Sequence, residues 1–166
     1  MEIRDIGAFL GYWEGIRSRT RRVVDRIPDE RFDWSPRDGA WSFADLLRHL
    51  ASIERWMFTE NAFRRPSRYP GCGPELADGP AAVRGYMDRL HRESLELLAT
   101  LGPDDLEARC VTPAGSEITV WKWLRAMVEH EVHHRGQIYL MLGQLGVATP
   151  PLYGLTAEEV AERSRP

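Results

Sequence analysis

Four long stretches of the sequence repeat their apolar residues with a helical period, and connections rich in Pro and Gly separate them. Each stretch is long enough for a helix that crosses a small domain. The stretches cover residues 5–27, 42–65, 78–101 and 119–145. Four such helices in one chain of 166 residues predict an all-α, four-helix bundle that forms a single domain over residues 1–166.

The connections add detail to this prediction. They are long enough for crossovers, so a simple up-down-up-down order is not required. In residues 106–119 the apolar pattern is short and is interrupted by turn residues, and we expect a small β-hairpin or an irregular excursion there. Asp78, Ser42 and Thr119 are suitable N-cap residues. A short helix is expected from Thr156 onward.

Charge gives little support to a nucleic-acid binder. The formal net charge is -3, whereas nucleic-acid binders are usually basic. An arginine-rich segment in the first helical stretch could form a phosphate-binding stripe, but Asp25 interrupts it, and we interpret it as a solvated helix face. This segment contains Arg17, Arg19, Arg21, Arg22 and Arg26.

The same composition favours a cytoplasmic protein. No stretch reaches the roughly 18 apolar residues of a membrane span. The N-terminus carries charges where a signal peptide has an apolar run. Cys72 and Cys110 lie far apart, which fits neither a disulfide framework nor a metal-binding pair.

Three histidines occupy positions where a plain core helix has Leu or Ile. His130 and His134 lie one turn apart in the apolar stripe of the fourth stretch, and His49 lies between Leu46 and Ile53 in the second. A single histidine of this kind is usually a hydrogen-bonded core residue. Burying three neutral imidazoles is costly unless each finds a partner, and one metal ion satisfies all three. The pattern therefore predicts a metal site.

Other polar residues in these helices receive weaker predictions. His133 is expected at the surface or behind the ligands, and His91 at a helix flank or an interface. Gln137 could support a ligand or could simply end the stripe. Glu131 is a candidate base, although a residue next to a ligand usually points away from the metal. Gly136 suggests close approach of another segment, because glycine weakens a helix.

His130–His134 also matches the HExxH pattern of zinc proteases, in which two histidines bind zinc and the glutamate is the base. Such proteases normally have a sheet that aligns the substrate and a third ligand downstream. Glu158 and Glu159 are the downstream candidates, but helix-breaking residues intervene and no sheet is expected. We therefore disfavour this interpretation.

Several segments together resemble the DinB/YfiT-like family of metal-dependent enzymes, which is unrelated to the DNA polymerase of similar name. The segments are Phe32-Asp33-Trp34-Ser35-Pro36, Trp41-Ser42, Leu46-Leu47-Arg48-His49-Leu50, His130-Glu131-Val132-His133-His134-Arg135-Gly136-Gln137, Leu142-Gly143-Gln144-Leu145-Gly146 and Pro150-Pro151-Leu152-Tyr153-Gly154. The resemblance spans nearly the whole chain. It implies a bundle in up-down-down-up order.

The resemblance also implies a divalent metal held by three histidines, which fall here on His49, His130 and His134. Three imidazoles favour zinc or nickel, with iron or manganese as alternatives. Members of the family are often homodimers, and Tyr12 and residues 66–74 are candidate contacts here.

The activity that the resemblance implies is a reaction on a small molecule. We expect a thiol-dependent S-transferase that uses a low-molecular-weight thiol such as mycothiol or bacillithiol. Three protein ligands leave a coordination position open for that thiol. The alternatives are a metal-dependent hydrolase and a non-catalytic metal-binding bundle that senses stress or metal.

Overall fold

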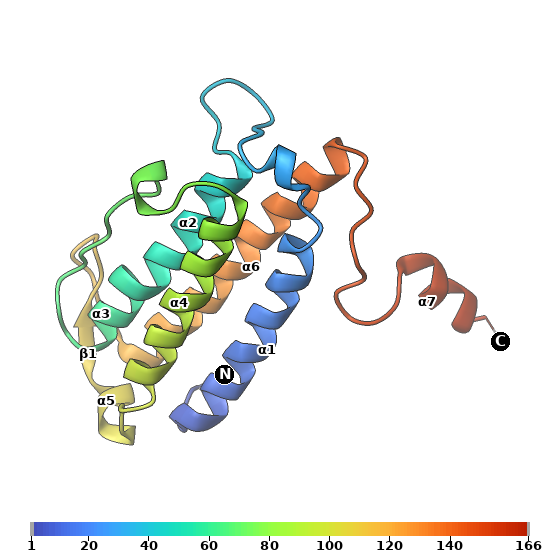
Figure 1. The fold of residues 1–166 in the computed structure, drawn as a ribbon. Coiled ribbons are helices and arrows are strands. Elements are labelled where there is room, and N and C mark those ends of the chain that lie inside the picture. Colours follow the sequence, from blue (N-terminus) through green and yellow to red (C-terminus); the bar gives the residue numbers. More distant parts are fainter. Residues whose placement is uncertain (1, 166) are drawn as a thin grey trace.

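Four long helical segments lie side by side in the computed structural model, which describes residues 2–165 (Figure 1). The second segment begins as an α-helix, continues through a π-helical turn and returns to α-helix. The segments are α1 (Ile6–Val24), α2 (Phe43–Ile53) with η2 (Glu54–Thr59) and α3 (Glu60–Ala62), α4 (Pro80–Leu98) and α6 (Val120–Gln144). The predicted all-α bundle is confirmed.

The order of the helices is up-down-down-up, as the resemblance implied. Figure 1 shows α1 and α6 running in one direction and α2 and α4 in the other. The closest packing is between α2 and α4 and between α1 and α6. The two helices of each pair run parallel. After leaving the first helix of a pair, the chain therefore has to travel back along the length of the bundle before it enters the second.

The apolar stripes of the helices pack together in two clusters along the length of the bundle. One cluster joins Leu46 and Leu50 of α2 to Leu90 of α4 and Ile138 of α6. The other surrounds Trp13 of α1 and contains Phe9, Phe58, Leu124 and Met127. The helical spacing of these residues in the sequence is therefore what packs the four helices together.

The helices begin at capping residues, with one correction to the sequence prediction. Ser42 and Asp45 form a capping box at the start of α2, with the Ser42 hydroxyl 3.1 Å from the Asp45 amide nitrogen. Thr119 occupies the N-cap of α6 without a capping hydrogen bond from its side chain. The N-cap of α4 is Gly79 and not Asp78, because the chain enters the helix with a φ of 81°, which favours glycine.

The π-helical turn η2 is a feature that the sequence pattern did not reveal. The Thr59 hydroxyl donates to the Glu54 carbonyl oxygen at 2.9 Å inside this turn. A π-turn holds more residues than an α-turn, so it changes the face that the following residues present. Glu54, its first residue, is buried in the bundle.

The connection between α4 and α6 contains the predicted hairpin. Strands β1 (Arg109–Val111) and β2 (Glu117–Thr119) pair antiparallel, with Cys110 opposite Ile118. A short helix, α5 (Pro103–Glu107), precedes them and was not predicted. The Gly102-Pro103 pair ends one helix, but a proline also suits the first turn of the next one. Short 3-10 turns, η1 (Asp29–Arg31) and η3 (Pro74–Leu76), occur in the other connections.

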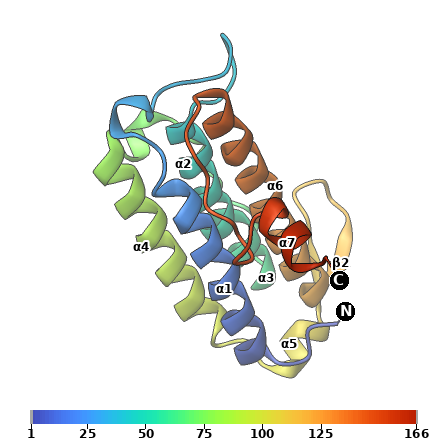
Figure 2. The same cartoon turned by 90° about the vertical axis from the view of Figure 1, so that its right-hand side faces the viewer.

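The chain after α6 leaves the bundle and runs back along α1. Arg22 donates to the Leu152 carbonyl oxygen at 2.7 Å, and Arg26 donates to the Ala148 carbonyl oxygen at 3.1 Å. The predicted final helix, α7 (Ala157–Arg163), is capped by Thr156 and stands apart from the bundle in Figure 1. Figure 2 views the molecule from the side of α7, which there lies in front of the bundle. No helix within residues 2–165 is both long and apolar enough to cross a membrane.

Candidate metal centre

The three stripe histidines meet between α2 and α6. His49 lies on α2, and His130 and His134 lie one turn apart on α6. The Nε2 atom of His130 is 3.1 Å from the Nε2 atom of His49 and 3.1 Å from that of His134. The ligand atoms of the three side chains all lie within 4.8 Å of one another, and this is the one such group among residues 2–165.

Hydrogen bonds on the far side of two rings orient them toward the common centre. His134 Nδ1 lies 2.6 Å from Gln137 Oε1, and an amide oxygen only accepts, so this nitrogen carries the proton. The Nε2 atom of His134 then presents a lone pair to its neighbours. Tyr69 lies behind His49 in the same way, with its hydroxyl 2.8 Å from Nδ1. Such outer contacts commonly fix the ring orientation of metal-binding histidines.

The donor set fits a divalent cation. Imidazole nitrogens about 2.0–2.1 Å from a tetrahedral zinc ion would lie roughly 3.3–3.4 Å apart. The two observed separations of 3.1 Å are close to this value. Without a metal, an N–H of one ring could donate a hydrogen bond to the lone pair of only one neighbouring ring. A cation attracts the lone pairs of all three rings at once.

Burial keeps the three rings neutral. It lowers the pKa of His49 to about 4, with a further contribution from His134. It lowers the pKa of His130 to about 3, assisted by the three neighbouring histidines. Burial also lowers the pKa of His134, against the opposing hydrogen bond with Gln137. Neutral imidazole is the form that binds a metal.

Aromatic side chains surround the histidines, and a groove opens beside them. The Trp41 ring lies 4.6 Å from that of His49 and 6.1 Å from that of His134, centroid to centroid. Phe58 lies 5.7 Å from His130 in the same measure. Trp41 and Gln137 also line a groove of about 370 Å³, together with Pro36, Arg37, Ala40, Leu46, Leu140, Met141 and Gln144.

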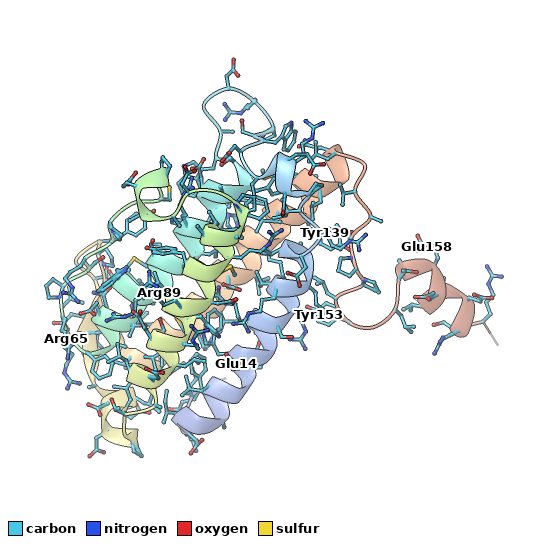
Figure 3. All side chains as sticks on the ribbon, in the orientation of Figure 1. Glu14, Arg65, Arg89, Tyr139, Tyr153 and Glu158 are labelled. Carbon is cyan, nitrogen blue, oxygen red and sulfur yellow. The ribbon has the colours of Figure 1, made fainter. Side chains whose placement is uncertain are left out.

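A second buried polar cluster lies where α1, η2 and α4 face α6, and two predictions are corrected there. Arg17, expected on a solvated face, is fully buried and pairs with Glu54 and with Glu131, the latter at 3.1 Å. His91, expected at a flank or an interface, is also fully buried. Its Nδ1 lies 2.7 Å from Glu54, and its Nε2 lies 2.5 Å from Glu14 of α1, which Figure 3 shows beside α4.

These predictions failed because the buried faces of α1 and α4 are not purely apolar: Arg17 lies in the first and His91 in the second. Burying an arginine requires carboxylate partners, and those come from η2 and α6, far away in the sequence. The other four arginines of the segment bind protein groups or an aromatic ring: Arg19 lies over Tyr153, Arg21 pairs with Asp88, and Arg22 and Arg26 bind the chain after α6.

The remaining polar residues of α6 divide into correct and wrong predictions. His133 is exposed, as expected. Glu131 points away from the histidines and into the ion cluster, which argues against a role as the base of a zinc protease. The sheet is a single hairpin in residues 2–165, and the third histidine comes from α2, not from a downstream ligand. Gly136 is in open space, so its predicted close contact is wrong.

Sequence reasoning missed Tyr69 and the role of Trp41. Tyr69 lies in a loop without periodicity, so only the fold shows that it reaches His49. Trp41 stands directly before the Ser42 cap, and its proximity to the histidine-bearing helix was a usable signal.

Comparison with known proteins assigns the chain to a family. The family model described as the DinB superfamily matches residues 12–138, which include all three histidines. The chain belongs to the DinB superfamily. A relative from Bacillus subtilis (strain 168), the uncharacterized protein YrdA, is 25% identical over 162 residues, which cover 93% of this chain and 91% of YrdA.

Solved structures show the same fold. A DinB-like protein from Bacillus cereus ATCC 10987 is similar with a TM-score of 0.75 and 17% identity, over 89% of this chain and 97% of that one. YfiT from Bacillus subtilis is similar with a TM-score of 0.69 and 19% identity, over 89% and 91% of the two chains. YfiT is described as a probable metal-dependent hydrolase with an unusual four-helix bundle topology.

Proposed function

We propose that this DinB-superfamily protein is a metal-dependent enzyme in which His49, His130 and His134 hold a divalent metal, with zinc or nickel preferred over iron or manganese. The observation that carries the proposal is the convergence of the Nε2 atoms, with His130 Nε2 3.1 Å from each of the other two. The neutral state of the three rings and the outer contacts of Gln137 and Tyr69 support it.

The proposed reaction is the transfer of a low-molecular-weight thiol to a small electrophile. When bound, the metal would act as a Lewis acid and lower the pKa of a coordinated thiol or water, which would then lose its proton. Gln137 and Tyr69 orient two of the three imidazoles, and the rings of Trp41 and Phe58 lie against the histidines. No carboxylate lines the groove beside Trp41, and Glu131 is occupied by Arg17. A nucleophile that the metal itself activates fits such a site, because it needs no separate base once it is coordinated.

The groove supports a small-molecule substrate. Its volume of about 370 Å³ lies within the usual range for small ligands. Its walls are mostly apolar, and Arg37 is the charged side chain among the residues that line it. An electrophile with an apolar body therefore fits beside the histidines.

Hydrolysis is the second candidate, because the structurally similar YfiT is described as a probable metal-dependent hydrolase. The two reactions differ in the nucleophile, water or thiol, at the same position. Turnover of 1-chloro-2,4-dinitrobenzene only with an added thiol would support the transferase. Cleavage of p-nitrophenyl acetate without thiol, lost in His49→Ala, would favour the hydrolase.

Elemental analysis of the untagged protein tests the metal site. We expect about one metal per chain, lost in His49→Ala and retained in His133→Ala, because His133 is an exposed neighbour. In the cobalt-substituted protein, 2-mercaptoethanol should change the visible spectrum if the thiol binds the metal. Retention of stoichiometric metal in His49→Ala would contradict the three-histidine assignment.

A homodimer stays a prediction from the resemblance. Tyr12, a candidate contact, is 48% exposed on α1 and thus available to a second copy. Sedimentation equilibrium of the purified chain would measure the mass directly.

A further inference from the structure

A large cavity has a lining that contains none of the three histidines. It has a volume of about 610 Å³ and lies between the end of α3 and the β-hairpin. Its lining consists of Asn61, Arg64, Arg65, Pro66, Ser67, Arg109, Cys110, Val111, Thr112, Pro113 and Gly115. It shares no lining residue with the groove beside Trp41. We propose that this cavity binds a small organic polyanion, recognised through its phosphate or carboxylate groups.

The lining is positively charged. Three guanidinium groups, those of Arg64, Arg65 and Arg109, face this region, and no carboxylate is among the lining residues. Guanidinium groups bind phosphate and carboxylate in a planar, two-point geometry. Figure 3 shows Arg65 at the outer side of the bundle, where a ligand can approach from solvent.

The backbone at Arg64 provides the second observation. The Arg65 amide donates to the Glu60 carbonyl oxygen at 3.0 Å, and the Arg64 amide donates to that of Asn61 at 2.8 Å. This is the Schellman pattern that ends a helix, and its left-handed position is usually a glycine. Arg64 occupies that position with a φ of 61°, the one non-glycine residue with positive φ in residues 2–165.

An arginine at a glycine position is disfavoured by its backbone, so its side chain has to contribute something in return. One contribution is the contact with Asp105, at 3.2 Å from Nη1. This ion pair is exposed, with side-chain exposures of 50% and 35%, and exposed pairs stabilise proteins little. The ion pair alone therefore gives a weak reason for an arginine at this turn, and anion binding gives a stronger one.

The carboxylates around the cavity leave its arginines available. Arg109 pairs with Glu117 at 3.2 Å in another exposed contact. Arg65 is 3.8 Å from Glu60, whose carboxylate is shared with Arg55 and Arg68 at 2.6 and 3.1 Å. A dianion or trianion that spans the cavity can compete with such dispersed partners.

Asn61 fixes the shape of this wall. Its Nδ2 donates to the Arg65 carbonyl oxygen at 2.9 Å, which holds the turn that presents the arginines. Its Oδ1 is buried and has no hydrogen-bond partner within the described chain. Buried acceptors are usually paired, so this oxygen needs a donor. A hydroxyl group of an organic polyanion such as citrate, or a water molecule, can donate to it, whereas an ionised carboxylate or phosphate oxygen cannot.

Calorimetric titration of the full chain with citrate and with pyrophosphate tests the proposal. Saturable one-to-one binding of either probe is expected, and the tighter probe identifies carboxylate or phosphate as the preferred group. Arg64→Gly is the decisive variant. Glycine suits the positive φ, so the free energy of unfolding should stay equal or rise, while the affinity falls at least tenfold.

Two further variants separate binding from structure. Asp105→Asn removes the competing carboxylate and should tighten binding severalfold, whereas a purely structural Arg64 predicts no gain. Arg4→Gly, which removes another surface arginine that has a carboxylate partner, should leave the affinity unchanged. Equal losses in Arg4→Gly and Arg64→Gly, or no saturable binding by the parent chain at millimolar probe, would overturn the proposal. Because the cavity is independent of the histidines, His49→Ala should bind the probes normally.

Discussion

Two polar clusters are buried in this bundle, and they meet the cost of burial in opposite ways. The histidine cluster between α2 and α6 is held neutral, with the pKa of His130 lowered to about 3 by burial. The ion cluster around Arg17 keeps its charges and pairs them, with Glu54 and Glu131 both contacting Nη2 of one guanidinium. Neutral lone pairs facing one another can accept a cation, whereas the carboxylates of the ion cluster already have a cationic partner. We therefore expect the first cluster to bind a metal and the second to stabilise the fold.

The largest expected effect comes from the ion cluster. Arg17→Leu leaves two buried carboxylates without their cation, so we expect the free energy of unfolding to fall by about 3–5 kcal/mol in urea denaturation. Arg19→Leu, two residues away and partly exposed, is the control and should change it by about 0.5 kcal/mol or less. If Arg17→Leu is nearly as stable as the parent chain, the cluster is not architectural.

The second effect concerns the stabilisation of the fold by metal. At a free metal concentration of about 100 times Kd, binding should add roughly 2.7 kcal/mol to the free energy of unfolding. His130→Ala removes the central nitrogen of the group and should lose this gain entirely. His133→Ala should keep it. Thermal unfolding with and without metal measures both, and a full gain in His130→Ala would place the metal elsewhere.

The third effect tests the outer contacts of the histidine cluster. Gln137→Ala removes the acceptor from His134 Nδ1, so the ring is less firmly oriented. Loss of such a contact typically weakens metal binding about 10–100-fold. Gln144→Ala changes another glutamine of the groove lining, one for which no contact with the histidines is found in the described residues, and should leave the affinity unchanged. Competition with a chromophoric chelator gives the two dissociation constants.

The fourth prediction concerns the pH dependence of the stability that the ion cluster provides. Burial alone raises the pKa of Glu54, but Arg17, His91 and Trp13 together outweigh it, and the folded-state pKa lies below the ordinary value of 4.5. The unfolded chain therefore takes up the proton first as the pH falls. The stabilisation is complete above about pH 4.5 and is lost as the pH falls through the lowered pKa.

Glu54→Gln should accordingly have a flatter acid limb in a plot of unfolding free energy against pH. The difference in slope is at most about 1.4 kcal/mol per pH unit for one proton. The metal-free proteins should be compared, so that metal release does not contribute. Parallel acid limbs for the two proteins would contradict the lowered pKa.

The smallest expected change in the free energy of unfolding comes from the cap of α2, a helix on which both clusters depend. Ser42→Ala removes the capping box of α2, the helix that carries His49 and leads into Glu54. We expect a loss of about 1 kcal/mol in the free energy of unfolding. Ser42→Asp restores a capping oxygen and should recover most of it. A change in metal affinity larger than this loss would show that the cap also positions Trp41.

The helical periods and the turn residues were sufficient to predict much of the fold. The four long helices, the hairpin before α6 and the pairing of His130 with His134 follow from local patterns, and His49 was joined to them by the cost of burying three imidazoles and by the family resemblance. The π-helical turn and α5 did not, because short departures from the α-helical period leave no clear trace in a stripe. Arg17 and His91 were misplaced because a polar residue in a stripe is buried only when distant partners accept it.

The sequence by itself determined which side chains lie on one face of each helix, since a helix fixes the angle between residues three and four apart. This was enough to place His130 and His134 together. Only the tertiary structure decided that Tyr69 orients His49, that Trp41 walls the site, and that Arg17 meets two carboxylates. The physical reason is that hydrogen bonds and ion pairs depend on distances between segments, and those distances are set by how the helices pack.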